Sequence, residues 1–266
     1  MSVHSSAIIH PSAELGQDIT VGPFAVIEAE VHIGDGTTIH SHATIKSGTK
    51  VGRNCKIYQG SVVGGDPQDL KFKDEKTYLE IADDVTIREY CTINRGTRAT
   101  GVTQINKGAL IMAYSHVAHD CLIDEYAILA NNVQLAGHVF VGVHAIVGGM
   151  TAVQQFVKIG DHGFIGGGTL VRKDVPPYIR VAREPLSYIG VNRIGLRRRG
   201  FDVETIKKIS DIYRVLFVKH SNLSIGLRHA KQSFDGHPLF EEITEFIAKS
   251  EKGIVRGFRQ MKSDDY

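Results

Sequence analysis

The densest group of reactive side chains lies at residues 115–121, which read SHVAHDC. His119 and Asp120 are neighbours there, and a histidine beside a carboxylate suits general-base chemistry. The carboxylate fixes the tautomer of the imidazole and stabilises the imidazolium that forms. Gly137 and His138 follow 18 residues beyond His119 and Asp120. Whether the four residues meet depends on the structural element that carries them.

That element shows in a repeat of six residues. An aliphatic residue recurs at every sixth position from Val3 to Val171: of 29 positions, 26 are Ile, Leu or Val, and the exceptions are Asp69, Glu75 and Ala99. This period matches neither a helical turn nor strand alternation. It is typical of a parallel β-helix, in which stacked repeats bury an apolar face that no repeat can bury alone. We therefore predict a mainly β fold of roughly ten triangular coils of about 18 residues each.

Small or β-branched residues usually stand four places after each aliphatic residue, and glycine often follows it directly. We expect large aliphatic side chains on the axis, small residues beside them and glycines at the corners. Cys55, Cys91 and Cys121 all occupy the small inward position. The first two should lie two coils apart, at about 9.6 Å, if the register holds. That distance excludes a disulfide, so we predict buried thiols.

The same period predicts how the reactive residues meet. Gly137 should stack over His119, and His138 over Asp120, at about 5 Å. Because Val117 is axial, we expect His119 on the outer, solvent-facing part of its coil. An exposed glycine N–H beside the imidazole could stabilise a developing oxyanion.

Two other interpretations of this cluster stay open. The histidines and the carboxylate could form a surface cluster without any reaction. Alternatively, His116, His119 and His138 could bind zinc, which needs three or four ligands. His144 and His162 also lie one period apart. Some hexapeptide solenoids that resemble γ-class carbonic anhydrases bind metal between subunits, but the histidine spacing here matches that family poorly.

Two polar stretches, 66–80 and 96–104, interrupt the repeat. Insertions of this kind often project from one face of a solenoid, so they could flank a ligand cleft. The repeat stops at the paired prolines of DVPPY, residues 174–178. We predict a β-helix domain over 1–176 and an α-helical domain over 177–266.

The second domain should consist of helices that cover the open end of the solenoid. We expect a short helix within 185–200 that ends at Gly200. A second helix should run from its cap at Asp202 to about His220. A weaker segment covers 224–234, and another helix begins near Pro238.

Charge and hydropathy limit the possible surroundings. The chain carries 16 basic and 19 acidic residues before Leu186, and 15 basic and 10 acidic residues from there on. The basic second part could attract an acidic partner, although a solvated helical surface is the more frequent explanation of such a charge balance. No apolar run is long enough to span a membrane, and the N-terminus lacks the features of a signal peptide. We therefore expect a cytoplasmic protein.

Several motifs together resemble one family across nearly the whole chain. They are PQDLK at 67–71, INRGT at 93–97, HVAHDC at 116–121, LAGHV at 135–139, GGMTAVQQF at 148–156, DVPPY at 174–178 and GVNRIGLRRRGF at 190–201. The sequence resembles the UDP-N-acetylglucosamine 3-O-acyltransferases of bacterial lipid A synthesis. The resemblance implies a left-handed β-helix, a homotrimer, and active sites in the clefts between subunits.

The resemblance also implies a reaction, the first step of lipid A biosynthesis. An (R)-3-hydroxyacyl chain moves from acyl carrier protein to the 3-hydroxyl of UDP-N-acetylglucosamine. His119 would be the general base, Asp120 would orient it, and the Gly137 amide would hold the thioester oxygen. Gly167 matches the position that limits acyl length. The sugar, the nucleotide or its phosphates would be bound by Gln68, Asp69, Lys71, His116, His138, Gln155, Asn192 and Arg199. No metal, other cofactor or nucleic acid is implied.

Three positions depart from the family pattern. Many members have His where this chain has Asn94 and Gln154, and Glu where it has Ile194. These departures leave the base motif intact but keep the acceptor open. An N-acyltransferase that acts on a 3-amino UDP-sugar is the first alternative. A metal-dependent solenoid like the carbonic anhydrases, or a scaffold without catalysis, is the second.

Overall fold

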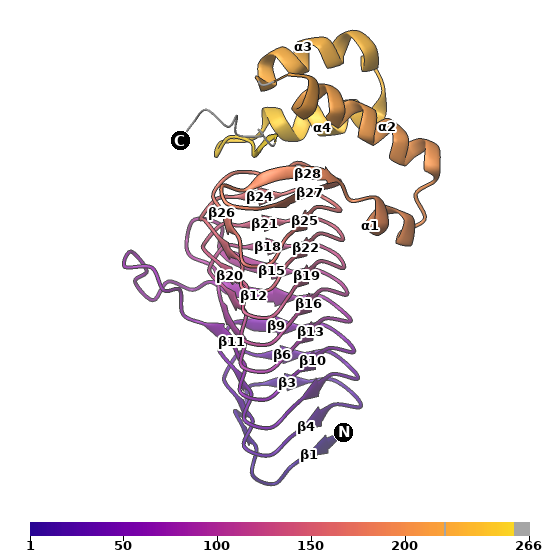
Figure 1. Cartoon of the computed structure of the whole chain (residues 1–266). Helices are drawn as coiled ribbons and strands as arrows, with labels where there is room; N and C mark the ends of the chain where they lie inside the picture. The colour runs from indigo at the N-terminus through magenta and orange to yellow at the C-terminus, as the bar shows by residue number, and fades with distance from the viewer. Residues whose placement is uncertain (221, 258–266) are drawn as a thin grey trace.

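The computed structural model describes residues 1–220 and 222–257. Residues 2–171 wind into a stack of coils, and helices cover the last coil (Figure 1). Within the coils, from β1 to β26, each strand pairs in parallel with the strand three places along the chain, as β1 does with β4 and β2 with β5. The strands therefore form three sheets, which we name A, B and C, and the predicted parallel β-helix is confirmed.

The strands are short, and each coil contributes one to each sheet. Sheet A has 12 strands: β1 (Ser2–Val3), β4 (Thr20–Val21), β7 (Thr38–Ile39), β10 (Lys56–Ile57), β13 (Thr86–Ile87), β16 (Leu110–Ile111), β19 (Ile128–Leu129), β22 (Ile146–Val147), β25 (Phe164–Ile165), β27 (Ile179–Ala182), β28 (Ser187–Val191) and β29 (Arg256–Gly257). Sheet B has 9 strands: β2 (Ile8–Ile9), β5 (Val26–Ile27), β8 (Thr44–Ile45), β11 (Val62–Gly65), β14 (Thr92–Asn94), β17 (His116–Val117), β20 (Gln134–Leu135), β23 (Ala152–Val153) and β26 (Leu170–Val171). Sheet C has 8 strands: β3 (Glu14–Leu15), β6 (His32–Ile33), β9 (Thr49–Val51), β12 (Tyr78–Ile81), β15 (Val102–Ile105), β18 (Leu122–Ile123), β21 (Phe140–Val141) and β24 (Lys158–Ile159).

The recurring aliphatic residues fill the axis of the stack. Ile39, Ile57, Ile87 and Ile111 stand above one another in sheet A and are completely buried. Glycine follows the aliphatic residue where successive coils touch. A Cβ on Gly34, for example, would lie 2.6 Å from the backbone of the next coil. This close approach, rather than a positive φ, requires glycine at that position.

Two loops increase the sequence spacing between paired residues but keep the six-residue period in step. Undisturbed coils pair residues 18 apart, as in Leu110 with Ile128. Across the first loop Lys56 pairs with Thr86, and across the second Thr86 pairs with Leu110. The first loop thus adds two six-residue repeats to its coil, and the second loop adds one. Sheet B accordingly counts 9 strands, one fewer than the ten coils that the repeat predicts.

The chain turns at three corners, which we name A–B, B–C and C–A after the sheets that they join. Both loops leave at the B–C corner, after β11 and β14, and the first projects from the stack in Figure 1. The prediction that loops emerge on one face is therefore confirmed. This corner is the part of the solenoid that departs most from a regular repeat.

The three cysteines are free and buried, as predicted, but their predicted spacing is wrong. Cys55 precedes β10 of sheet A, Cys91 precedes β14 of sheet B, and Cys121 precedes β18 of sheet C. The first loop lies between Cys55 and Cys91 and moves them to different sheets. Burial raises the pKa of the Cys55 and Cys91 thiols to about 11 and that of Cys121 to about 12, so all three stay protonated.

Helices follow the solenoid in the predicted order. They are α1 (Arg193–Arg198), α2 (Val203–Tyr213), its π-helical continuation η1 (Arg214–Lys219), α3 (Leu223–Phe234) and α4 (Pro238–Ala248). Asp202 caps α2 by accepting from the Thr205 N–H over 2.7 Å. The predicted helix within 185–200 is only partly right, because Ser187–Val191 forms β28. That segment extends sheet A by pairing antiparallel to β27, and α1 occupies only the residues after it.

Two tyrosines attach the helices to the last coil. The Tyr213 hydroxyl, fully buried on α2, donates to the Pro177 carbonyl over 2.7 Å. The Tyr178 hydroxyl donates to the Glu242 carboxylate of α4 over 2.6 Å. Sheet A continues past the paired prolines, since β27 pairs with β25. The division at residues 176 and 177 stays a prediction.

The axial packing can be tested within one strand, β19. Leu129 is fully buried, whereas Ile128 beside it points outward and is half-buried. We expect Leu129→Ala to lower the free energy of unfolding by about 2–5 kcal/mol, because it leaves a cavity on the axis. The matched Ile128→Ala variant should lose about 1 kcal/mol or less. Guanidinium unfolding at one protein concentration measures both, and equal losses would contradict the inward assignment.

Candidate active site at the B–C corner

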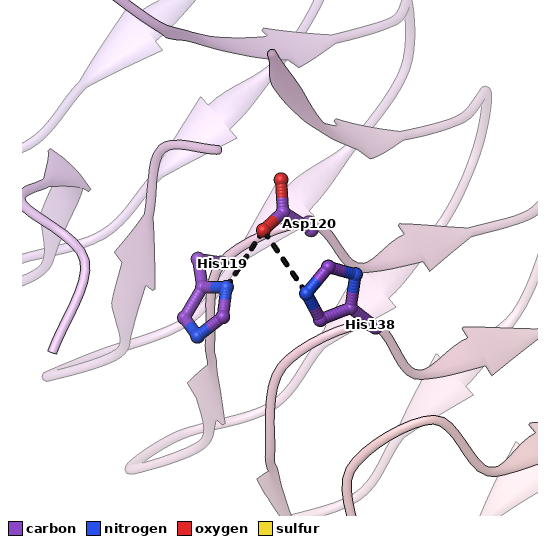
Figure 2. A group of neighbouring side chains, drawn as sticks. All are labelled: His119, Asp120 and His138. Atoms are coloured by element: carbon purple, nitrogen blue, oxygen red, sulfur yellow. Dashed lines mark hydrogen bonds and ion pairs between the residues drawn. The ribbon is translucent and has the colours of Figure 1, made fainter. Parts of the chain in front are cut away.

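His119, Asp120 and His138 gather at the turns after β17 and β20, as Figure 2 shows. The His119 Nδ1 lies 2.7 Å from Oδ2 of Asp120, and the His138 Nε2 lies 3.4 Å from the same oxygen. The two rings meet edge to face with 5.3 Å between centroids. The His138 N–H donates to the His119 carbonyl over 3.0 Å, so the coil backbone fixes this approach. The predicted stacking is confirmed.

The second loop holds the Asp120 carboxylate. Oδ1 accepts from the Thr97 N–H over 2.9 Å, and Oδ2 accepts from the Thr97 hydroxyl over 2.7 Å. The Thr100 hydroxyl also donates to Oδ1. The Asp120 N–H in turn donates to Thr103 over 2.8 Å. These bonds offset the cost of the left-handed turn at Asp120 (φ 60°), which is on the order of 1 kcal/mol for an L-residue.

Sequence reasoning missed these three threonines. Thr97 closes the INRGT motif, and Thr100 follows it in a stretch that was expected only to flank a cleft. A hydroxyl-rich loop one coil before the carboxylate–histidine pair was the available signal, but loop conformation does not follow from the repeat. The structure makes this loop a support for the carboxylate.

The prediction of a solvent-facing His119 is wrong. The residue is only 7% exposed, and Asp120 is equally buried. Gly137 covers one face of the imidazole so closely that a Cβ there would lie 2.5 Å from its Cε1. Glycine is therefore required at 137 by contact with the ring. The corner position lies outside the axis, as expected, but neighbouring coils and the second loop cover it.

Burial and hydrogen bonding act on the Asp120 carboxylate in opposite directions. Burial alone would raise its pKa, but the hydrogen bonds from Thr100, His119 and Thr97 together hold the pKa below its usual range. The group is therefore ionised at neutral pH. An ionised carboxylate at Nδ1 holds the proton on that nitrogen and leaves a lone pair on Nε2 of His119.

The Gly137 amide is placed to donate outward. At the same turn position in some other coils, the N–H donates to a carboxylate of the next coil. The Arg53 N–H donates to Asp83 over 2.7 Å. The Val143 N–H donates to Asp161 over 2.9 Å. Among the described residues, no carboxylate caps Gly137 in this way. Its N–H is available to a ligand oxygen beside the His119 ring.

Two further predicted residues lie around this pair. His116 bonds through Nδ1 to the Thr92 hydroxyl over 2.7 Å, and burial lowers its pKa. Burial also lowers the pKa of His138, although Asp120 and Asp69 act against it. Both imidazoles are thus mainly neutral at pH 7, which suits hydrogen bonding to hydroxyls.

The first loop carries Gln68, Asp69 and Lys71. Asp69 lies close enough to His138 to act on its pKa. The Lys71 N–H donates to the Asp69 carboxylate over 2.9 Å, and the side chains of Gln68 and Lys71 are exposed. The loop thus brings one of the three against the cluster and presents the other two to solvent.

Residues missed by sequence reasoning anchor this loop. The Arg95 guanidinium donates to Asp66 over 2.9 Å and lies 5.1 Å from the Phe72 ring. Asn94, one of the family departures, is buried and donates from Nδ2 to the Asp66 carbonyl over 2.8 Å. Its Oδ1 has no partner among the described residues. This amide therefore helps to hold the loop that carries the predicted sugar-binding residues.

The remaining predicted residues divide among the corners. Gln155 lies at the B–C corner, one coil beyond Gly137, because Leu135 pairs with Val153. Gly167 follows β25 and lies at the A–B corner, where a Cβ would approach the Gly149 carbonyl at 3.0 Å.

Asn192 and Arg199 lie at the C–A corner. The Asn192 side chain donates to the His162 carbonyl over 2.9 Å and caps α1. Burial, His144 and Arg199 lower the pKa of His162 to about 4. His144 and His162 stack with 5.3 Å between their rings, as the period predicts. Within one chain, therefore, the predicted site residues occupy three different corners. Ile194, another departure, is exposed on α1.

The residues that could bind a metal ion in this structure differ from the predicted ligands. Among the described residues, His119, Asp120 and His138 offer ligand atoms within 4.8 Å of one another, and His116 does not join them. Both Asp120 oxygens already accept hydrogen bonds from the second loop. The donor set fits a hydrogen-bonded catalytic pair better than a cation site.

Comparison with known proteins agrees with this arrangement. Residues 174–255 match the family described as UDP N-acetylglucosamine O-acyltransferase, domain 2, and residues 30–65 match six bacterial transferase hexapeptide repeats. An acyl-[acyl-carrier-protein]–UDP-N-acetylglucosamine O-acyltransferase of Alkalilimnicola ehrlichii is 48% identical over 255 residues, which cover 96% of this chain and 99% of that protein. This chain belongs to the UDP-N-acetylglucosamine O-acyltransferase family. The counterpart from Thiobacillus denitrificans is 43% identical over 256 residues, again with 96% and 99% coverage.

Solved structures of UDP-N-acetylglucosamine acyltransferases share the whole architecture. The protein from Bacteroides fragilis is 41% identical with a TM-score of 0.93, and the alignment covers 96% of this chain and all of that one (100%). The one from Arabidopsis is 32% identical with a TM-score of 0.85, covering 96% and 100%. In the part of this family member that the structure describes, no helix is long and apolar enough to cross a membrane.

The lowered pKa of Asp120 makes a prediction about stability in this acyltransferase. Because the folded state favours the carboxylate, Asp120 stabilises the fold above the usual carboxyl pKa, and this contribution is lost on acidification. We expect Asp120→Asn to lower the melting temperature at pH 7. The deficit should shrink as the pH falls below about 4. Melting curves of both proteins between pH 7 and 3 measure the difference.

Asp161 supplies the matched control with the opposite sign. Burial, assisted by Asp124, raises its pKa despite the hydrogen bond from Val143. The folded state thus favours the protonated form, and its contribution is lost as the pH rises. Asp161→Asn should therefore become relatively more stable than wild type at higher pH. A deficit of Asp120→Asn that stays constant from pH 7 to 3 would contradict the assignment.

Proposed function

We propose that this protein transfers an (R)-3-hydroxyacyl group from acyl carrier protein to the 3-hydroxyl of UDP-N-acetylglucosamine. This is the first step of lipid A biosynthesis, and we propose that it takes place in the cytoplasm. The names of the relatives support the carrier-bound donor and the sugar-nucleotide acceptor. The observation that carries the proposal is the His119–Asp120 pair, which stands directly beside an uncapped glycine amide.

His119 acts as the general base. The Asp120 carboxylate, 2.7 Å from Nδ1, supports a lone pair on Nε2. Nε2 takes the proton of the sugar 3-hydroxyl while that oxygen attacks the thioester carbon. The imidazolium then gives this proton to the departing thiolate, so the products are the ester and the free carrier thiol. Asp120 stabilises the imidazolium in between.

Gly137 stabilises the charge that develops on the thioester oxygen. As the carbonyl carbon becomes tetrahedral, its oxygen becomes an oxyanion and accepts from the Gly137 N–H. Two facts support this role: the absence of a carboxylate cap among the described residues, and the contact of Gly137 with the His119 ring. Base and donor thus act on the same reacting centre.

The acceptor is bound by residues of two subunits in a homotrimer. Asp69, His116 and His138, with Gln68, Lys71 and Gln155 nearby, hold the sugar at the B–C corner. Asn192 and Arg199 hold the nucleotide and its phosphates from the C–A corner of a neighbour, and an arginine fork suits diphosphate. Their separation within one chain supports the homotrimer, since a closed ring of three places different corners together. Gly167, at the third corner, leaves room for the acyl chain.

Removal of the base tests the reaction. We expect His119→Ala to lower acyl transfer by about a hundred- to ten-thousand-fold, because the 3-hydroxyl loses its proton acceptor. The control His4→Ala removes an exposed imidazole that bonds to the nearby Ser6, far along the chain from the cluster, and should retain activity. Mass spectrometry should follow UDP-N-acetylglucosamine and its 3-amino analogue with 3-hydroxyacyl carrier-protein donors. Full turnover by a folded His119→Ala protein would refute the base, and an amide formed only on the analogue would change the acceptor.

The division of the site between subunits predicts complementation. His119→Ala and Arg199→Ala chains should each be nearly inactive alone. Mixed trimers formed from equal amounts should regain about a quarter of the wild-type sites, because a site then needs one intact corner from each of two neighbours. Co-expression with two affinity tags and an acyl-transfer assay would measure this. A trimer without any recovered activity would show that both residues serve one chain's site.

A further inference from the structure

A column of corner residues leads from the catalytic pair to the helical end of the solenoid. Val117 pairs with Leu135, Leu135 with Val153, and Val153 with Val171. The residues two places further on are His119, Gly137, Gln155 and Lys173, which therefore stack in that order. Lys173 stands three coils from His119, about 14 Å along the axis.

A cavity of about 670 Å³ opens at this end of the column. It lies between β26, the turn before β28 and the strand β29. Its lining combines apolar residues with cations and includes Leu170, Arg172, Lys173, Leu186, Val255 and Arg256. Leu170 is 43% exposed, and the three cations are exposed.

Aromatic and basic groups connect this cavity to the catalytic site. Phe156 is 43% exposed and stacks on His138 with 4.5 Å between the rings. The Lys252 ammonium lies 5.4 Å from the Phe156 ring. The Lys173 ammonium lies near Gly253, the residue after Lys252. A Cβ added to that glycine would be 3.9 Å from the ammonium. A basic surface thus runs from His138 to the cavity.

Few acidic groups oppose this charge. Glu184 lines the cavity and pairs with Arg172 over 3.4 Å. Glu251 is exposed beside Lys252. Asp174 is fully buried, where it accepts from the Ser250 hydroxyl over 2.6 Å and from the Lys158 N–H. The surface therefore keeps an excess of positive charge beside the apolar lining residues.

We propose that this basic cavity, formed around Arg172, Lys173 and Arg256, is where the acidic acyl carrier protein docks. The inference rests on the proposed function and adds the position of the donor. The donor carries its thioester on a phosphopantetheine arm, which spans about 18 Å when extended. A carrier seated on the cavity can therefore pass the arm along the Phe156 side of the corner and reach Gly137. Complementary charge would orient it, and its apolar contacts would cover Leu170.

The test is a double charge reversal, Arg172→Glu with Lys173→Glu. Its matched control is Lys207→Glu with Arg228→Glu, which reverses two exposed cations on α2 and α3. Each protein is assayed with 3-hydroxyacyl carrier protein and with the same acyl group on pantetheine, which lacks the carrier. We expect the KM for the carrier-bound donor to rise at least about tenfold in the first variant only. The KM for the sugar nucleotide and turnover with acyl-pantetheine should stay unchanged, and added salt should weaken the wild type more than the variant.

Each other result overturns the docking site in its own way. An unchanged KM for the carrier-bound donor places the carrier elsewhere. An equal loss with acyl-pantetheine means that the cavity binds the arm or the acyl chain and not the carrier surface. If the wild type transfers from neither donor, the proposed function itself fails, which distinguishes that failure from a misplaced docking site.

Discussion

The parallel hydrogen bonding of each coil to the next is the interaction on which everything else in this structure depends. Strands of two residues cannot persist alone, so each one exists because the coils before and after it supply partners. The aliphatic residue on the axis sets which side faces inward. Together they place residues 18 apart in contact, and that relation lays Gly137 against the His119 ring.

The same scaffold becomes a site only at the corner where it is interrupted. Both loops leave at the B–C corner, and each meets the catalytic residues in a different way. The second loop donates hydrogen bonds to both oxygens of the Asp120 carboxylate through Thr97 and Thr100. The first loop places Asp69 near His138. The regular coils supply position, and the loops supply charge and hydrogen bonds. A cluster without these loops would be an ordinary row of exposed corner residues.

The repeat predicted most of the fold, because a period of six residues has only one common structural solution. It also predicted which residues stack, including His144 on His162. It did not predict the burial of His119 or the bonds of Thr97, since those depend on loop conformation. The spacing of Cys55 and Cys91 was wrong because register arithmetic fails across a loop. The prediction assigned the residues of β28 to a helix. It failed because this five-residue segment becomes a strand by pairing with β27, and its own sequence does not indicate that pairing.

The two ends of the stack differ in what covers them, and the covered end is the one that is synthesised later. The N-terminus lies at the uncovered end, whereas the helices lie over the last coil (Figure 1). At typical translation rates one coil leaves the ribosome in about 1 to 4 s. Each new coil then meets a completed coil whose strand edges are still unpaired, and it can add to that template without waiting for the rest of the chain. The helices arrive last and close the growing edge, so co-translational assembly proceeds in one direction and has a built-in stop.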